Sequence, residues 1–226
     1  MKARERADET GLALFRRLGL RPFELRWTER SIAKSEVMAV GELLELQGKD
    51  TAETLVIVLN AVLQFINQYA DGVMIHVSTG HSLRLNIKQS SSSFPGLKKA
   101  NEEGRLKSVC VQNIHDLIKC IARIESSIRD TMCLVVFEGL TPLLLQQMPP
   151  GDSSSEVPAA TDALLQRLGD LQESCCVLSL WVSTHVPAGQ GGLREGKGPV
   201  VALWRQRLRR RLILSPDRGV QDMSTF

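Results

Sequence analysis

The turn between Gly48 and Thr54 carries residue types that bind phosphate in many nucleotide-binding proteins. A loop of the form G-x-x-x-x-G-K-[ST] surrounds phosphates with backbone N–H groups, neutralises them with its lysine and holds magnesium with its hydroxyl. Here the loop is one residue shorter, Ala52 stands at the second glycine position and Glu53 at the lysine position. A carboxylate repels a triphosphate, so we expect no ATP binding of the usual kind. Taken alone, a glycine between a strand and a helix is also an ordinary α/β feature.

An acid that could complete such a site is Glu138, which follows the apolar run 133–137. In phosphate-binding proteins the acid at the end of the corresponding strand is usually Asp and helps to hold magnesium, so Glu is itself a departure. The candidate residues of a degenerate nucleotide site are Gly48, Ala52, Glu53, Thr54 and Glu138. A weak nucleotide hydrolase that uses Thr54 and Glu138 in an unconventional pocket stays open as an alternative.

Other residues with chemical potential lack the partners that catalysis or metal binding needs. Ser183, Thr184 and His185 end a predicted strand, but no acid and no nucleophile-elbow motif accompanies them. No catalytic residue is therefore predicted. His76 and His81 could bind a metal, but no further ligand stands at a suitable spacing, which favours turn residues over a metal site.

Basic residues gather toward the end of the chain, where five arginines occupy the eight positions 204–211. On a strand, alternate residues share a face and form a row that can follow a phosphate backbone. The glycine-rich stretch 189–198 adds two basic residues, although its composition alone indicates only flexibility. The alternative for the arginines is a solvated edge strand that charge protects against aggregation. The predicted DNA-binding residues are Arg194, Lys197, Arg205, Arg207, Arg209 and Arg211.

Length and composition predict one soluble, intracellular domain. Of the 226 residues, 43% are hydrophobic and only 4% aromatic, so Leu, Val and Ile must form most of the core. The net charge of +3 is too small to identify a nucleic-acid-binding protein by itself. Five cysteines without metal-ligand spacing predict buried free thiols in a reducing compartment. The charged N-terminus argues against a signal peptide, and no segment has the roughly 18 apolar residues of a membrane span.

The spacing of apolar residues predicts helices that alternate with strands. Helices are expected at 8–18, 55–66, 113–127 and 160–173. Strands are expected at 42–47, 72–77, 107–111, 131–137 and 176–182, with a last strand or strand pair at 200–214. A connecting segment through Pro22 and Trp27 and polar loops at 87–104 and 149–158 are expected between them. Such alternation predicts an α/β fold with a largely parallel sheet covered by helices on both faces.

The predicted N-terminal helix carries an apolar stripe that includes Leu12, Phe15 and Leu18. This stripe is either part of the core or a face that docks a partner, and its three residues are the predicted partner-binding residues. On this basis the chain divides into residues 1–40, an N-terminal helix with its connecting segment, and residues 41–226, the main domain.

The order and spacing of several segments resemble the RecA-like recombinase paralogues, most closely the short X-ray repair cross-complementing type that lacks the N-terminal helical domain. The resemblance covers most of the chain at low identity. It rests on residues 8–12, 41–48, 76–85, 104–109, 113–118, 133–139 and 203–215. The resemblance implies a RecA-like core with a degenerate P-loop and a stretch at 189–198 that faces single-stranded DNA.

The same resemblance implies a function in homologous recombination and DNA double-strand break repair. Proteins of this family act in complexes that promote recombinase filaments on single-stranded DNA. We therefore expect a nuclear, non-catalytic subunit that binds other recombinase paralogues, the strand-exchange recombinase and, weakly, single-stranded or branched DNA. No cofactor and no metal are expected. A structural P-loop-like subunit of an unrelated complex is a further alternative, beside the weak nucleotide hydrolase.

Overall fold

A computed structural model of the chain describes residues 10–17, 19–29, 32–48, 51–79, 93–128, 131–140, 142–143, 159–184, 208–214 and 221–222. The helices are α1 (Gly11–Arg17), α2 (Thr51–Gln68), α4 (Pro95–Glu102), α5 (Ile114–Ser127) and α7 (Ala159–Ser174). The strands are β1 (Phe23–Glu29), β2 (Ile32–Met38), β3 (Leu43–Gly48), β4 (Val73–Ser78), β5 (Leu106–Cys110), β6 (Cys133–Glu138), β7 (Val177–Thr184), β8 (Leu208–Leu214) and β9 (Gln221–Asp222). Strands and helices alternate from β3 to β7, which confirms the predicted α/β class.

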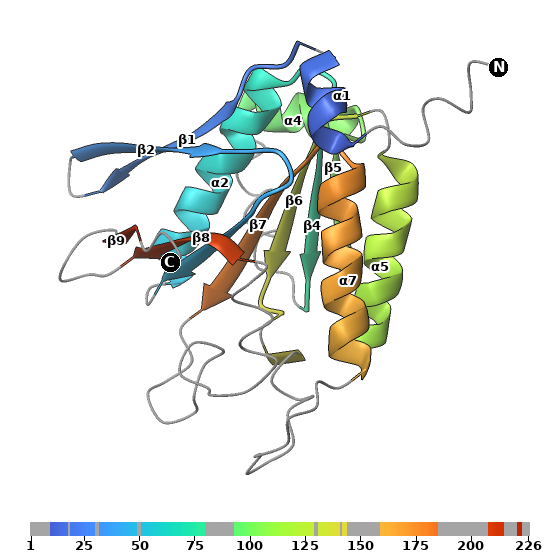
Figure 1. Cartoon of the computed structure of the whole chain (residues 1–226). Helices are drawn as coiled ribbons and strands as arrows, with labels where there is room; N and C mark the ends of the chain where they lie inside the picture. The colour runs from blue at the N-terminus through green and yellow to red at the C-terminus, as the bar shows by residue number, and fades with distance from the viewer. Residues whose placement is uncertain are drawn as a thin grey trace.

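The described strands from β3 onward form one sheet in the order β5-β4-β6-β7-β3-β8-β9 (Figure 1). Every pairing from β5 to β8 is parallel, and only β9 runs antiparallel to its neighbour. The carboxyl ends of the parallel strands therefore meet at one edge of the sheet. In open parallel sheets this edge is where ligands usually bind.

Helices cover both faces of this sheet, each over its own apolar layer (Figure 1). α2 and α4 pack on one face, in a layer that includes Met74 and Val136. α5 and α7 pack on the other face, in a layer that includes Ile75 and Phe137. Because successive side chains of a strand point to opposite faces, each central strand supplies both layers. All six residues of β6 are buried, namely the apolar run 133–137, as its sequence predicts, and Glu138 at its end.

Helix α5 shows how the local sequence determines an element. The Asn113 side chain accepts a hydrogen bond from the Asp116 backbone N–H at 2.9 Å, which satisfies one free donor at the start of the helix. Ile114, Leu117 and Ile121 recur at helical spacing and are buried. The predicted helix at 113–127 is thereby confirmed within one residue.

Residues 23–38 form a β-hairpin, although only a connecting segment was expected there. β1 and β2 pair antiparallel from Phe23 opposite Met38 to Glu29 opposite Ile32. Phe23 and Leu25 are fully buried in the layer that contains α2, and Figure 1 shows the hairpin lying across this helix. Polar residues alternate with Phe23 and Leu25, as is typical of a strand with one buried face, and this pattern was not recognised in the sequence.

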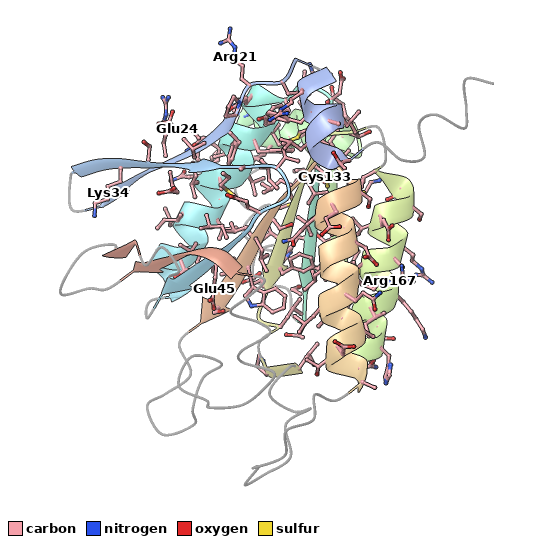
Figure 2. The ribbon with its side chains drawn as sticks, viewed as in Figure 1. Arg21, Glu24, Lys34, Glu45, Cys133 and Arg167 are labelled. Atoms are coloured by element: carbon pink, nitrogen blue, oxygen red, sulfur yellow. The ribbon has the colours of Figure 1, made fainter. Side chains whose placement is uncertain are left out.

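Three polar side chains attach this hairpin: Gln64 and Gln68 of α2, and Tyr69, which follows the helix. We call these three residues the α2 clasp. Gln64 accepts from the Arg26 N–H at 2.9 Å and donates to the Arg26 carbonyl at 2.6 Å, as a neighbouring strand would. Gln68 Nε2 donates to the Pro22 carbonyl at 2.9 Å, and Tyr69 Oη donates to the Arg21 carbonyl at 2.5 Å. Arg21 makes this contact through its backbone carbonyl, while its side chain points away from the protein in Figure 2.

Two further expectations about elements were wrong. Residues 95–102 form α4, not a loop, because Pro95 lies at the start of the helix, where its missing N–H costs nothing, and Leu97 and Ala100 bury one side. The helix after β3 begins at Thr51 and not at Leu55, so the connection is shorter than the sequence indicated. The remaining parts of the predicted loops at 87–104 and 149–158 lie mostly outside the described residues.

The cysteines are all free thiols, and four of them are buried as expected: Cys120, Cys133, Cys175 and Cys176. Burial raises the pKa of the Cys176 thiol to about 12. Cys110 differs, since it lies exposed on β5, the strand at the end of the described sheet order.

Candidate functional site at the carboxyl ends of the parallel strands

The connection between β3 and α2 is very short. Gly48 is the last residue of β3 and Thr51 the first of α2, and the two residues between them lie outside the described part of the chain. A phosphate loop needs about four residues between its glycines to curl backbone N–H groups around an anion. Ala52 and Glu53, which the sequence places in the shortened loop, belong to the first turn of α2.

Thr54 and Glu138 lie at the same edge of the sheet but on elements that are not adjacent. Thr54 is in the first turn of α2, with 1% of its surface exposed, and Glu138 ends β6. Strand β7 lies between β3 and β6. Two strand spacings correspond to roughly 10 Å, so the two parts of the predicted nucleotide site come from separate strand ends. The side chains of Ala52 and Glu53 lie outside the described residues.

Glu138 has a partner that the sequence did not indicate, His76. The register of β4 and β6 places Ser78 beside Glu138 and His76 two residues before it, so His76 and Glu138 share the sheet face that α2 covers. His76 Nε2 lies 2.6 Å from Glu138 Oε2, and the two side chains are only 1% and 9% exposed. The expectation that His76 is a turn residue was wrong, because it lies inside β4.

The surroundings of the other ring nitrogen of His76, Nδ1, indicate which ring nitrogen carries a proton. Nδ1 is buried and has no hydrogen-bond partner among the described residues. A proton on Nδ1 would leave a buried N–H without an acceptor, which costs about 1–3 kcal/mol. We therefore place a proton on Nε2, from which it donates to Glu138.

Two hydrogen bonds to Gly139 connect the carboxyl ends of the strands next to this pair. Thr79 Oγ1 donates to the Gly139 carbonyl at 3.1 Å, and the Gly139 N–H donates to the Val182 carbonyl at 3.3 Å. Gly139 has a φ of 66°, a left-handed conformation that glycine adopts without strain. The ends of β4, β6 and β7 are thus joined directly behind Glu138.

A second buried carboxylate, Glu45, lies on the opposite face of the sheet. The Ser183 hydroxyl of β7 donates to Glu45 Oε1 at 2.7 Å, and the two residues are 3% and 5% exposed. This hydrogen bond joins β7 to β3 through their side chains. The sequence contained one signal for this site, an acid between leucines in a strand that is buried on both faces.

The predicted DNA-binding residues are only partly within the described chain. Arg194, Lys197, Arg205 and Arg207 lie outside it, and for Arg209 and Arg211 only the backbone in β8 is described. β8 lies between β3 and β9, and its register with β3 shifts between Leu43 and Leu44. A regular alternation of the arginines along the strand is therefore interrupted at this point.

The predicted partner-binding residues of α1 do not behave alike. Leu12 is 46% exposed, whereas Phe15 is partly buried and packs against the layer that contains α2. Leu14, which lies between them, is almost fully buried. Leu18 lies outside the described residues. Of this stripe the described structure leaves Leu12 on the surface.

The N-terminal segment packs on the main sheet layers at two places. β1 packs on α2, and α1 packs at the amino end of β7, where a Cβ at Gly11 would overlap the Cys175 carbonyl. The division at residue 40 therefore separates parts of the sequence that contact each other in the fold.

No group of three or more metal-binding side chains occurs among the residues that the structure describes. In the same part of the chain, no helix is both long enough and apolar enough to cross a membrane. Compared with known proteins, the chain matches no protein-family model and no curated protein.

Proposed function

We propose that this chain is a non-catalytic, nuclear subunit of a recombinase-paralogue complex that assists homologous recombination and double-strand break repair by binding partner paralogues and DNA. The observation that carries the proposal is the His76–Glu138 pair. The acid that would help to hold magnesium in an active relative is instead buried against a histidine at 2.6 Å.

Two features at this edge of the sheet support the absence of ATP chemistry. A magnesium ion would have to compete with the Nε2–H donor for Glu138 Oε2 inside a site that is almost fully buried. The connection from Gly48 to Thr51 is also too short for a phosphate-binding nest of the usual kind. In this proposal the chain keeps the scaffold of a nucleotide-binding fold. Glu138, the acid that would act at the phosphate, instead stabilises the fold through its contact with His76.

Binding to partners is supported by the exposed edge strand of the sheet, β5. β5 is the first strand in the sheet order, and its residues Lys107–Cys110 are exposed. An edge of this kind can accept a strand from another chain through backbone hydrogen bonds. Together with Leu12 of α1, β5 is the proposed contact surface for paralogues and for the strand-exchange recombinase. The proposed DNA contact consists of the basic residues Arg194, Lys197, Arg205, Arg207, Arg209 and Arg211.

The decisive experiment is a pull-down of the tagged full chain from nuclear extract, followed by mass spectrometry. Recovery of recombinase paralogues or of the recombinase supports the proposal and names the complex. A Leu12→Asp variant with the same expression level is the matched control, since it should recover less of any partner that docks on α1. Recovery of an unrelated assembly by both proteins would overturn the recombination role and favour a structural subunit.

The hydrolase alternative is tested with a fluorescent ATP analogue in the presence of magnesium. We expect a flat titration of the wild-type chain. Saturable, magnesium-dependent binding that disappears in Thr54→Ala and Glu138→Gln would favour the weak hydrolase. Because Glu138→Gln keeps an acceptor for His76, this variant separates loss of the charge from loss of the fold.

A further inference from the structure

The outer edge of β5 carries backbone groups that no described strand pairs. Toward β4, the Arg105 carbonyl accepts from the Met74 N–H at 2.8 Å, and the Val111 N–H donates to the Ser78 carbonyl at 2.9 Å. Because backbone groups alternate in direction along a strand, the odd-numbered residues from 105 to 111 face β4. The N–H and carbonyl groups of the even-numbered residues, 106, 108 and 110, therefore point away from the described sheet.

The side chains of β5 leave this edge accessible. Lys107, Ser108, Val109 and Cys110 are all exposed, Val109 to 37%. The register with β4 places Lys107 opposite Ile75, so Lys107 and Val109 lie on the face of the sheet that α5 and α7 cover. Unpaired backbone groups beside an exposed valine form a surface to which a further strand can be added.

The strand is complementary to a second copy of itself in one antiparallel register. A two-fold axis through Ser108 places Leu106 opposite Cys110 of the second copy, so each outward-facing residue pairs with another through both backbone groups. In this register Lys107 lies opposite Val109 of the second copy, which the aliphatic part of the lysine can cover. An axis through Lys107 would bring two like charges together, and an axis through Val109 would leave Leu106 unpaired. The residues of β5 therefore favour the axis at Ser108.

We propose that β5 pairs with β5 of a second copy of this chain, antiparallel and about a two-fold axis at Ser108, so that the two sheets become continuous. This inference goes beyond the proposed function, because it concerns the chain without any other partner. A strand of another protein that docks on β5 competes with the second copy for the same backbone groups.

The pairing is tested by sedimentation equilibrium of the purified full chain. The Ser108 N–H points away from β4, so Ser108→Pro removes an outward donor and no hydrogen bond between β4 and β5. Ser108→Ala keeps this donor and is the matched control. We expect the wild-type chain and Ser108→Ala to dimerise equally, and Ser108→Pro to lower the association constant by about tenfold or more. A monomeric wild-type chain, or equal association constants for the two variants, would overturn the proposal.

Disulfide trapping tests the register, and it decides alone if Ser108→Pro fails to fold. Cys110→Ala first removes the exposed thiol of β5, since the other cysteines are buried. In this background Ser108→Cys places two thiols at the axis, where paired Cα atoms are about 5.5 Å apart, a separation that suits a disulfide. The oxidant is glutathione disulfide, which takes up two electrons and two protons from the thiols and becomes two molecules of glutathione.

The control for this trapping experiment is Asn101→Cys in the same background, an exposed position on α4. We expect covalent dimers of Ser108→Cys to form about tenfold faster or more, because pairing holds its two thiols at a high effective concentration. Equal rates for the two variants would show that Ser108 does not lie at a two-fold axis and would overturn the proposal.

Discussion

The strand ends around His76 and the α2 clasp both join elements through polar side chains, but they differ in charge and in burial. His76 and Glu138 are an ionisable pair with side chains 1% and 9% exposed. The α2 clasp joins neutral amides and a phenol to backbone groups of Arg21, Pro22 and Arg26. A buried charge without its partner costs several kcal/mol, whereas a neutral hydrogen bond contributes about 1 kcal/mol.

This difference shows how the fold distributes its polar stability. At the strand ends, an ionisable pair is buried where ligands bind in related architectures. At the clasp, several separate hydrogen bonds attach one hairpin, and the loss of any one leaves the others. Substitutions at the two regions are therefore expected to differ in size and in additivity.

The largest effect is expected for His76→Ala. Removing the imidazole takes the 2.6 Å contact away from the buried Glu138 carboxylate, and we expect a loss of about 3–5 kcal/mol in the free energy of unfolding. Urea denaturation followed by tryptophan fluorescence measures this loss. The double variant His76→Ala with Glu138→Gln removes the charge as well and should recover part of the stability. A double variant as unstable as the sum of both single ones would contradict the pairing.

A smaller effect is expected for Gln64→Ala in the clasp. The substitution frees both the N–H and the carbonyl of Arg26, and we expect a loss of about 1–3 kcal/mol. Gln166→Ala on the exposed side of α7 is the matched control, because it makes the same change of helix propensity without a contact to β1. Hydrogen exchange of the β1 amides should increase in Gln64→Ala only. Equal exchange in both variants would mean that Gln64 does not hold the hairpin.

The elements that the sequence predicted are those whose burial is visible within a few residues. The first five residues of β6 are an unbroken apolar run, and α5 has an N-cap and an apolar stripe of its own. The hairpin of β1 and β2 was missed because its stability depends on α2, which lies about forty residues later: the Arg26 backbone is paired by Gln64 at a separation of 38 positions. α4 was missed because proline and serine near its start are typical of loops as well as of helix N-termini.

The candidate site was predictable at the level of single residues but not of pairs. Glu138 could be identified because an acid follows a buried run. Its partner His76 is 62 positions away, and Glu45 and Ser183 are separated by 138 positions. These pairs depend on which strands are neighbours and in which register, and neither is present in local periodicity. The sequence therefore indicated Glu138 as a candidate residue and not the contacts that it makes.

The clasp also makes a prediction for high pH through Tyr69, the single tyrosine of the chain. Burial, with a smaller effect of the nearby Cys176 thiol, raises the pKa of Tyr69 to about 12 from an ordinary value of 10.0. Because the folded protein holds this proton more strongly than the unfolded chain, the associated stability is complete below pH 10.0 and is lost as the pH rises toward about 12. Ultraviolet absorbance of tyrosinate measures the titration directly. Tyr69→Phe should be less stable at neutral pH and should lack this part of the decline, and an ordinary pKa in the wild type would contradict the buried clasp.

The smallest effect is expected for Arg26→Ala, which separates the backbone of Arg26 from its side chain. The guanidinium is exposed and, together with a weaker effect of Ser35, holds the pKa of Glu24 below 4.5. A lowered pKa contributes stability above the ordinary value and loses it as the pH falls through the folded value. In Arg26→Ala the pKa of Glu24 should rise only partly, since Ser35 remains, and the denaturation midpoint at neutral pH should not change measurably because exposed ion pairs contribute little. The clasp holds the backbone at this position, so it should persist in the variant. NMR titration of the Glu24 carboxyl and hydrogen exchange of β1 test both statements, and faster exchange in Arg26→Ala would show that the side chain, and not the α2 clasp, secures the hairpin.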